Sequence, residues 1–191
     1  MTGDALPAGG SLPFPLEGST LILGPANVGK TRLTARALDA WIGEHGTDGV
    51  AVLEFAPELE RGGRLLGGRL DRFTRVPDGV WRGVIEARAP RAESEDDEEA
   101  LGLAGENAAC ARTAWEAAPA EPRAVFVNDA TIPFQAGENP SRLATYCDGA
   151  DAAVLNAFAG DELGVEDPVS RFEREALSEF RAWADRVVDL P

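Results

Sequence analysis

The chain has 191 residues, of which 44% are hydrophobic and 27% charged, so it can bury the core of one ordinary domain and is not expected to be disordered. Its 33 acidic residues outnumber 18 basic ones, and the net charge of -15 argues against nucleic acid and anionic membranes as partners. No apolar run of about 18 residues predicts a membrane span. The two cysteines, Cys110 and Cys147, form no disulfide framework, which favours a reduced, cytoplasmic protein.

The predicted elements alternate between strands and helices along the chain. Residues 1–18 are rich in Gly, Pro and Leu and predict a mobile or loosely docked arm, followed by a single domain over 19–191. Short apolar runs predict strands, and apolar positions at helical spacing predict helices. The strands are 20–23, 50–55, 124–128, 152–156 and 187–190, and the helices are 31–45, 100–118 and 170–184. This order predicts an α/β fold, a mostly parallel sheet with helices on both faces.

Three segments leave their structure open. Residues 59–70 have apolar positions for a helix, but four glycines argue against one. The stretch 81–85 is either a weak strand or a loop. The acidic run within 91–99 is either a solvated loop or the first turn of the next helix.

Residues 24–31 contain the most informative motif, because they match the pattern G-x-x-x-x-G-K-[ST] between a predicted strand and a predicted helix. In order they are Gly24, Pro25, Ala26, Asn27, Val28, Gly29, Lys30 and Thr31. The two glycines permit a loop whose backbone N–H groups face a phosphate, and the helix that follows adds its N-terminal dipole. We expect Lys30 to reach the β- and γ-phosphates and the Thr31 hydroxyl to ligate Mg²⁺.

Lys30 is also the only lysine in the chain, whereas 17 positions carry arginine. A chain that uses arginine elsewhere and keeps one lysine here indicates a chemical requirement for a compact point charge. The alternative is a chance glycine-rich turn between a strand and a helix. The excess of acid with arginine in place of lysine resembles the proteins of salt-loving archaea, and a GC-rich genome is the alternative source of this composition.

A second acid is needed to hold the metal. The apolar segment 124–128 ends in Asn128 and is followed by Asp129, at the strand end where ligands bind in parallel sheets. We therefore expect Asp129 to organise Mg²⁺, through water, and Asn128 to hold a water or a phosphate oxygen. The alternative is that Asp129 only caps the turn that follows.

Taken together, the motif and its flanking elements resemble the P-loop NTPases, and the segment 50–58 resembles the second strand of the RecA-like branch. This resemblance implies a three-layer sandwich that binds Mg·ATP, with an acidic residue near the end of the second strand orienting the nucleophile. Glu54 and Glu58 are the candidates. A helix-start carboxylate is the alternative for Glu58, and Glu54 within an apolar strand is a buried carboxylate that needs a partner. ATP is favoured over GTP because residues 156–159, Asn-Ala-Phe-Ala, lack a guanine-reading motif.

Weaker matches resemble the adenosylcobinamide kinase/guanylyltransferase family. They are Trp81 with Ile85-Glu86 and Pro90, the segment 127–132, and residues 164–190. This resemblance implies phosphorylation of a cobinamide-like alcohol. The family's nucleotide-carrying histidine is missing from 59–73, and the single histidine, His45, ends the first predicted helix, so guanylyl transfer is not expected.

The sequence thus predicts ATP-dependent phosphoryl transfer to a small molecule, or ATP hydrolysis. The alternatives are a regulatory ATP-binding module that controls a protein partner, and a RecA-type DNA-dependent ATPase, against which the missing basic clusters argue. The segment 131–140, with Gln135 and Gly137, is either a substrate loop or a connector. The RecA-like resemblance also implies a homo-oligomer as one possible state.

Overall fold

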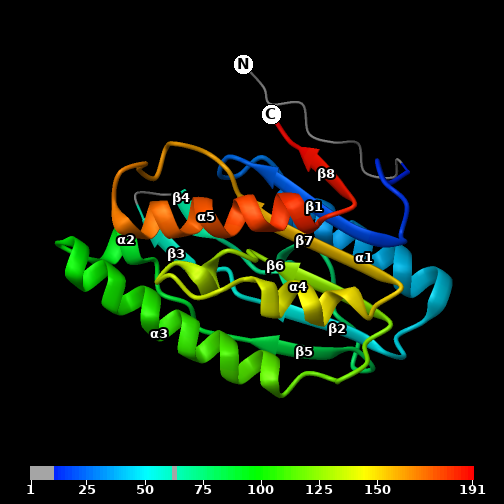
Figure 1. The fold of residues 1–191 in the computed structure, drawn as a ribbon. Coiled ribbons are helices and arrows are strands. Elements are labelled where there is room, and N and C mark those ends of the chain that lie inside the picture. Colours follow the sequence, from blue (N-terminus) through cyan, green and yellow to red (C-terminus); the bar gives the residue numbers. More distant parts are fainter. Residues whose placement is uncertain (1–10, 62–63) are drawn as a thin grey trace.

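In a computed structural model, which describes residues 11–61 and 64–191, six strands of the described chain form one all-parallel sheet (Figure 1). Their order across the sheet is β5-β2-β6-β7-β1-β8. The strands are β1 (Gly18–Gly24), β2 (Val50–Glu54), β5 (Trp81–Val84), β6 (Ala124–Asn128), β7 (Ala152–Phe158) and β8 (Arg186–Asp189). Because all six run in the same direction, their carboxyl ends meet along one edge of the sheet.

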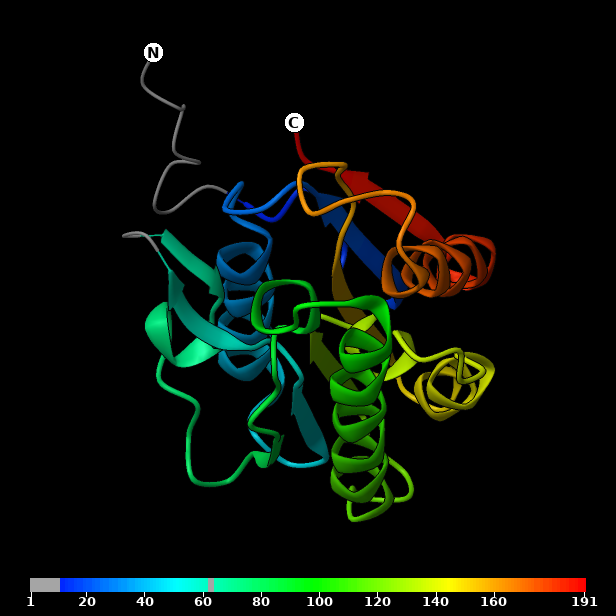
Figure 2. The same ribbon diagram turned by 90° about the vertical axis from the view of Figure 1, so that its left-hand side faces the viewer.

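Helices cover both faces of this sheet, as Figure 2 shows. Helix α1 (Lys30–His45) lies on one face, and α3 (Asp97–Glu116), α4 (Ser141–Asp148) and α5 (Pro168–Trp183) lie on the other. Side chains alternate between the two cores, as the period of two in a strand requires. In β1, for example, Ile22 packs with α1, whereas Leu21 and Leu23 pack with the other three helices. The predicted α/β fold with a parallel sheet and helices on both faces is confirmed.

The described part of 59–70 forms a pair of strands in place of the helix that its apolar positions allow and its glycines argue against. Strands β3 (Glu58–Arg61) and β4 (Arg64–Gly67) pair antiparallel, and the short helix η1 (Leu70–Arg72) follows them. Gly67, at the end of β4, has a φ of 77°, a left-handed conformation that glycine adopts without strain. Gly67 therefore marks the end of a hairpin strand, and Gly62 and Gly63 lie outside the described residues.

The acidic segment 91–99 contains the end of one helix and the first turn of another. Helix α2 (Pro90–Glu93) comes first, and α3 begins only at Asp97. The side chain of Asp96 caps α3 by accepting a 2.9 Å hydrogen bond from the backbone N–H of Glu99. Acidic residues in the first turn then favour the helix dipole. Sequence patterns did not predict α4 or the short helix η2 (Ile132–Phe134).

The segment before β1 is described only in part, because residues 1–10 of the expected arm lie outside the described residues. Within 11–17, Phe14 is 6% exposed and packs into the α1 core, and Leu12 and Leu16 lie against the same core. Across the part of the chain that the structure describes, every helix falls short of the length and apolarity needed to cross a membrane.

Candidate functional site

The motif residues form a tight loop that connects β1 to α1. Asn27 has a φ of 63° and Gly29 a φ of 101°, so the loop turns twice through the left-handed region. Gly29 is the N-cap residue of α1, and the helix begins at Lys30. The loop therefore delivers Lys30 and Thr31 at the amino end of a 16-residue helix, where the backbone dipole favours an anion.

The side chain of Lys30 folds back over this loop. Its Nζ donates hydrogen bonds of 2.9 Å to the carbonyl oxygen of Gly24 and of 2.6 Å to that of Pro25. Burial lowers the pKa of Lys30, and the nearby carboxylates of Asp129, Glu162 and Glu173 oppose this shift. The ammonium thus lies in a partly desolvated position among acids, where its electrostatic attraction to an anionic ligand would be stronger than in water.

A carboxylate of the chain itself also reaches the loop. The backbone N–H of Ala26 donates a 2.6 Å hydrogen bond to Oε1 of Glu162, an exposed residue in the segment between β7 and α5. One backbone donor of the loop is therefore bonded to an anionic group of the protein.

Polar side chains at the ends of β6 and β7 support the start of α1. Asn128 Oδ1 accepts hydrogen bonds from Thr31 Oγ1 at 3.3 Å and from Asn156 Nδ2 at 3.0 Å. Asn156 Nδ2 also donates to Thr34 Oγ1 at 2.9 Å. Since β7 lies between β1 and β6, this chain of bonds crosses the carboxyl edge of the sheet and holds Thr31 against the end of β6.

Asp129 follows β6 in a left-handed conformation, with a φ of 63°. Its backbone N–H donates to Asn156 Oδ1 at 3.1 Å. Its Oδ1 is buried and has no hydrogen-bond partner in the described part of the chain. Burial and the nearby Glu173 raise the pKa of Asp129 to about 7, although Lys30 and Arg91 pull in the opposite direction. A cation bound beside this carboxyl would lower its pKa and favour the ionised form.

Glu54 and Glu58, the two carboxylates expected to orient the nucleophile, are paired with arginines. Glu54 is fully buried, and its oxygens accept from Arg82 Nη2 at 2.9 Å, from Asn128 Nδ2 at 2.9 Å and from the backbone N–H of Leu70 at 3.1 Å. Glu58 is exposed at the start of β3, with Arg69 and Arg72 at 3.9 and 3.8 Å. The partner that the buried Glu54 requires is Arg82, brought alongside by the pairing of β2 with β5.

One large cavity gathers the other predicted site residues except Gly24 and Pro25, which are not among its lining residues. It has a volume of about 1200 Å³, and its wall includes the loop and helix start over 26–32, the ends of β6 and β7 with Asn128, Asp129 and Asn156, and the chain end at Leu190 and Pro191. Lys30, Thr31 and Asp129 thus line one space. Glu54 and Glu58 are not among its lining residues.

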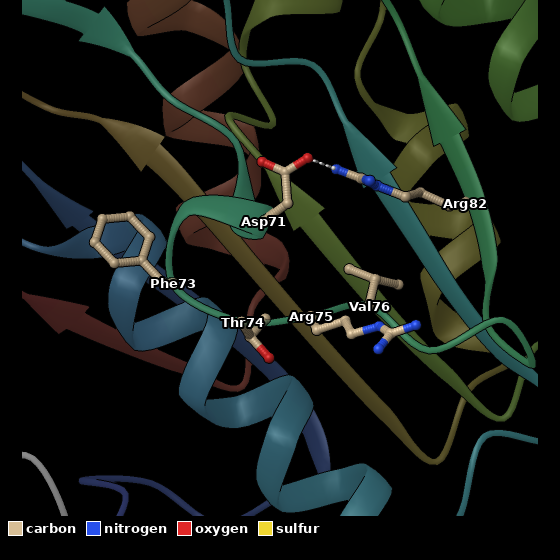
Figure 3. Close-up of a pocket in the computed structure, with 6 residues that line it drawn as sticks. All are labelled: Asp71, Phe73, Thr74, Arg75, Val76 and Arg82. Atoms are coloured by element: carbon tan, nitrogen blue, oxygen red, sulfur yellow. Dashed lines mark hydrogen bonds and ion pairs between the residues drawn. The ribbon is translucent and has the colours of Figure 1, made fainter.

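A smaller hollow of about 460 Å³ lies beside η1 (Figure 3). Its lining residues are Asp71, Phe73, Thr74, Arg75, Val76 and Arg82. Asp71 and Arg82 form an ion pair of 2.9 Å, and Arg82 also binds Glu54, so Arg82 links η1 and β2 to β5. Figure 3 shows Phe73 and Thr74 on the connection above α1.

A polar cluster that sequence patterns did not indicate lies on the wall formed by α2, η2 and α5, called the far wall below. Glu173 of α5 is 4% exposed; its Oε2 accepts from Arg91 Nη1 at 2.6 Å, and its Oε1 accepts from Thr131 Oγ1 at 3.1 Å and from Gln135 Nε2 at 3.0 Å. The sequence carried one signal, since Glu173 falls on the same helix face as the buried Val169, Ala176 and Phe180.

A scan against protein-family models finds no match, and a search of curated proteins finds no relative either. The geometry of the cavity and the chemistry of its wall therefore carry the functional argument.

Proposed function

We propose that this protein binds Mg·ATP in the large cavity and transfers the γ-phosphoryl group to a small alcohol. The observation that carries the proposal is that Lys30, Thr31 and Asp129, predicted separately from two motifs, line the same cavity beside a loop that leads into a helix N-terminus. Pockets for small ligands usually measure about 300–1000 Å³. The cavity is large enough for a nucleotide and part of an acceptor.

In the proposed reaction, the acceptor hydroxyl oxygen forms a bond to the γ-phosphorus of ATP. The bond between that phosphorus and the β–γ bridging oxygen breaks, ADP leaves, and the hydroxyl proton passes to solvent or to a nearby base. Lys30 would stabilise the charge on the γ-phosphate, and the loop N–H groups would hold the β-phosphate. Binding would require the Lys30 ammonium to exchange the carbonyl oxygens of Gly24 and Pro25 for phosphate oxygens.

The residues present fit a magnesium ion. Asp129 Oδ1 is a buried oxygen without a partner, which a divalent cation would satisfy directly or through water. Thr31 Oγ1 donates its proton to Asn128, so its lone pairs remain available to a metal. Among the described residues no three His, Cys, Asp or Glu side chains gather into a metal cluster, so phosphate oxygens and water would complete the shell, as Mg²⁺ prefers.

The regulatory ATP-binding module is the second candidate, and the position of Glu54 favours it. Glu54 accepts hydrogen bonds from Arg82, Asn128 and the backbone of Leu70, and neither Glu54 nor Glu58 lines the cavity. A protein in which no carboxylate orients the nucleophile would hold the nucleotide with little turnover. ADP production in the presence of added alcohols separates this candidate from the kinase.

The first test is calorimetry of Mg·ATP binding in molar KCl, with GTP as the comparison. Lys30→Ala should weaken binding about 100-fold, because a charge-assisted contact to phosphate is lost. The matched control is Arg112→Ala, which removes one positive charge from the exposed surface of α3 and should leave affinity unchanged. Absence of binding by either nucleotide to the folded wild type would overturn the proposal.

A further inference from the structure

The far wall of the cavity carries one polar group that the proposed roles do not use. Gln135 lines the cavity and is 1% exposed. Its Nε2 donates to Glu173, which fixes the orientation of the amide and turns Oε1 into the free acceptor. Oε1 is buried and has no hydrogen-bond partner in the part of the chain that the structure describes. A buried acceptor without a donor destabilises the protein, unless a ligand supplies the donor.

The position of this amide is firmly held. The preceding residue, Phe134, is 2% exposed and packs edge-on against Trp115 and Phe180, with ring centroids 6.2 and 5.7 Å away. Glu173, which binds the amide nitrogen, is itself bonded by Arg91 and Thr131. These contacts from α3, α5 and α2 pre-organise Gln135 on a rigid part of the scaffold, as a binding group requires.

The chemistry around Gln135 selects a neutral ligand. Both oxygens of Glu173 already accept hydrogen bonds, and its charge is paired with Arg91 at 2.6 Å. The acceptor left for a ligand on this wall is the uncharged Oε1. The neighbouring lining residues Ala89, Pro90 and Ile132 present apolar surface. A molecule that fits this wall has a hydroxyl donor and an apolar body.

We infer that the end of the cavity between α2, η2 and α5 binds the acceptor alcohol, whose hydroxyl donates a hydrogen bond to Gln135 Oε1 while its apolar body packs on Pro90 and Ile132. This inference rests on the proposed function for the identity of the acceptor, but the binding site itself can be tested without nucleotide. It assigns the segment 131–140 to substrate binding and gives Gln135 the role of a specificity-determining residue.

The test uses the full chain, free of glycerol, and cyclohexanol as a probe with one hydroxyl and an apolar ring. Gln135 is the only glutamine, so labelling glutamine with ¹⁵N gives a single side-chain amide signal in the NMR spectrum. We expect cyclohexanol to shift this signal in a saturable manner with a Kd in the low millimolar range, about 1–10 mM for so small a ligand. Methoxycyclohexane, which has the same ring but no donor, should bind at least tenfold more weakly.

A variant supplies the second arm. Gln135→Met keeps the size of the side chain and removes the acceptor, and a ¹³C-labelled methyl of Ile132 reports binding in its place. Cyclohexanol affinity should fall at least tenfold in this variant and come to equal that of methoxycyclohexane. Arg112→Ala, on the exposed surface of α3, should bind cyclohexanol as the wild type does. Because this titration contains no nucleotide, a failure of the nucleotide site is distinguishable from a failure of this one.

Three outcomes would overturn the inference. They are an unshifted Gln135 signal at 50 mM cyclohexanol, equal affinity for the alcohol and the ether in the wild type, and a shift of the same size caused by Mg²⁺ alone. The last outcome would assign Oε1 to a metal. The comparison of the two ligands on the wild-type protein keeps the test decisive even where Gln135→Met does not fold.

Discussion

The backbone N–H of Ala26 and the carboxylate of Glu162 are joined by a 2.6 Å hydrogen bond, although the two residues lie 136 positions apart. The donor belongs to the loop that we propose to hold phosphates. Glu162 also opposes the lowering of the Lys30 pKa through its charge. The carboxylate thus competes with a phosphate for a backbone donor and for the neighbouring ammonium.

Glu162→Gln is therefore expected to strengthen binding of ATP about 3- to 10-fold at low ionic strength, because it removes a competing anion and a like charge. The gain should shrink in molar KCl, where charges are screened within about 3 Å. Calorimetry checks both conditions. Glu166→Gln removes the same charge from an exposed position in the same segment and should change little. Weaker binding by Glu162→Gln would mean that Glu162 assists the nucleotide.

The raised pKa of Asp129 predicts a pH-dependent cost to stability. In the unfolded chain an aspartate titrates near 3.9, whereas burial and Glu173 raise the pKa of Asp129 to about 7 in the folded protein. Between these values the folded state holds the extra proton, so the free energy of unfolding falls as pH rises through this window. Asp129→Asn removes the penalty and should stabilise the protein by about 2–4 kcal/mol above pH 7, with no gain near pH 4.

Urea unfolding without Mg²⁺ or nucleotide at pH 4, 6 and 8 measures this difference. Asp48→Asn makes the same change at an exposed position and should show no such trend. Because Asp129 is the proposed metal-organising carboxylate, the stabilised variant should also bind Mg·ATP more weakly. A constant difference in stability across the three pH values would argue against the buried carboxylate.

The ion pair between Glu54 and Arg82 predicts a structural role for this glutamate. Arg82→Met leaves the fully buried Glu54 carboxylate without its cation and should destabilise the protein by about 3–5 kcal/mol in urea unfolding. Arg75→Met changes an exposed arginine on the connection between η1 and β5 and should change the free energy of unfolding little. Adding Glu54→Gln to Arg82→Met should recover part of the loss, since the unpaired charge is gone.

Glu54→Gln alone should retain Mg·ATP affinity wherever it folds, since Glu54 does not line the cavity. Its effect on any ADP production should follow the folded fraction. A loss of turnover in a fully folded Glu54→Gln protein, with ATP binding intact, would instead support the general-base role expected from the sequence.

The two cysteines predict a simple test of the fold. Cys110 is exposed on α3, whereas Cys147 of α4 is 2% exposed and its pKa is raised by burial and by Asp148. A thiol reagent should modify one equivalent in the native protein and two in urea, because the thiolate is the reactive form. Cys110→Ser should show no fast reaction in the native state. Rapid labelling of both thiols would mean that α4 does not pack as described.

The strands and the larger helices were predictable because their sequence signal is local. Apolar runs such as 124–128 have few alternatives to a buried parallel strand, and the loop at 24–29 lies between a strand and a helix as its pattern requires. The hairpin of β3 and β4 was not recognised, because its apolar residues also suit a helix. Helix α4 has only eight residues and weak local cues, and its packing against the sheet stabilises it.

The site was predictable only where one stretch of sequence contains the whole signal. The partner of Glu54 could be required from the sequence but not named, because Arg82 reaches it through the pairing of β2 with β5. The cluster of Gln135 and Glu173 joins residues 38 positions apart on two elements, and no local pattern connects them. Tertiary contacts between separate elements thus form these pairs of residues, which no local sequence pattern indicates.

The last strand has a practical consequence for experiments. The backbone N–H of Leu190 bonds to the carbonyl oxygen of Leu23 at 2.7 Å, directly before the loop that we propose to hold phosphates, and Leu190 and Pro191 belong to the cavity wall. Any affinity handle or fluorophore attached after Pro191 would thus be anchored at the mouth of the proposed nucleotide site. A dye placed there becomes a reporter of ligand entry, and a purification tag placed there becomes a source of artefact in every binding assay.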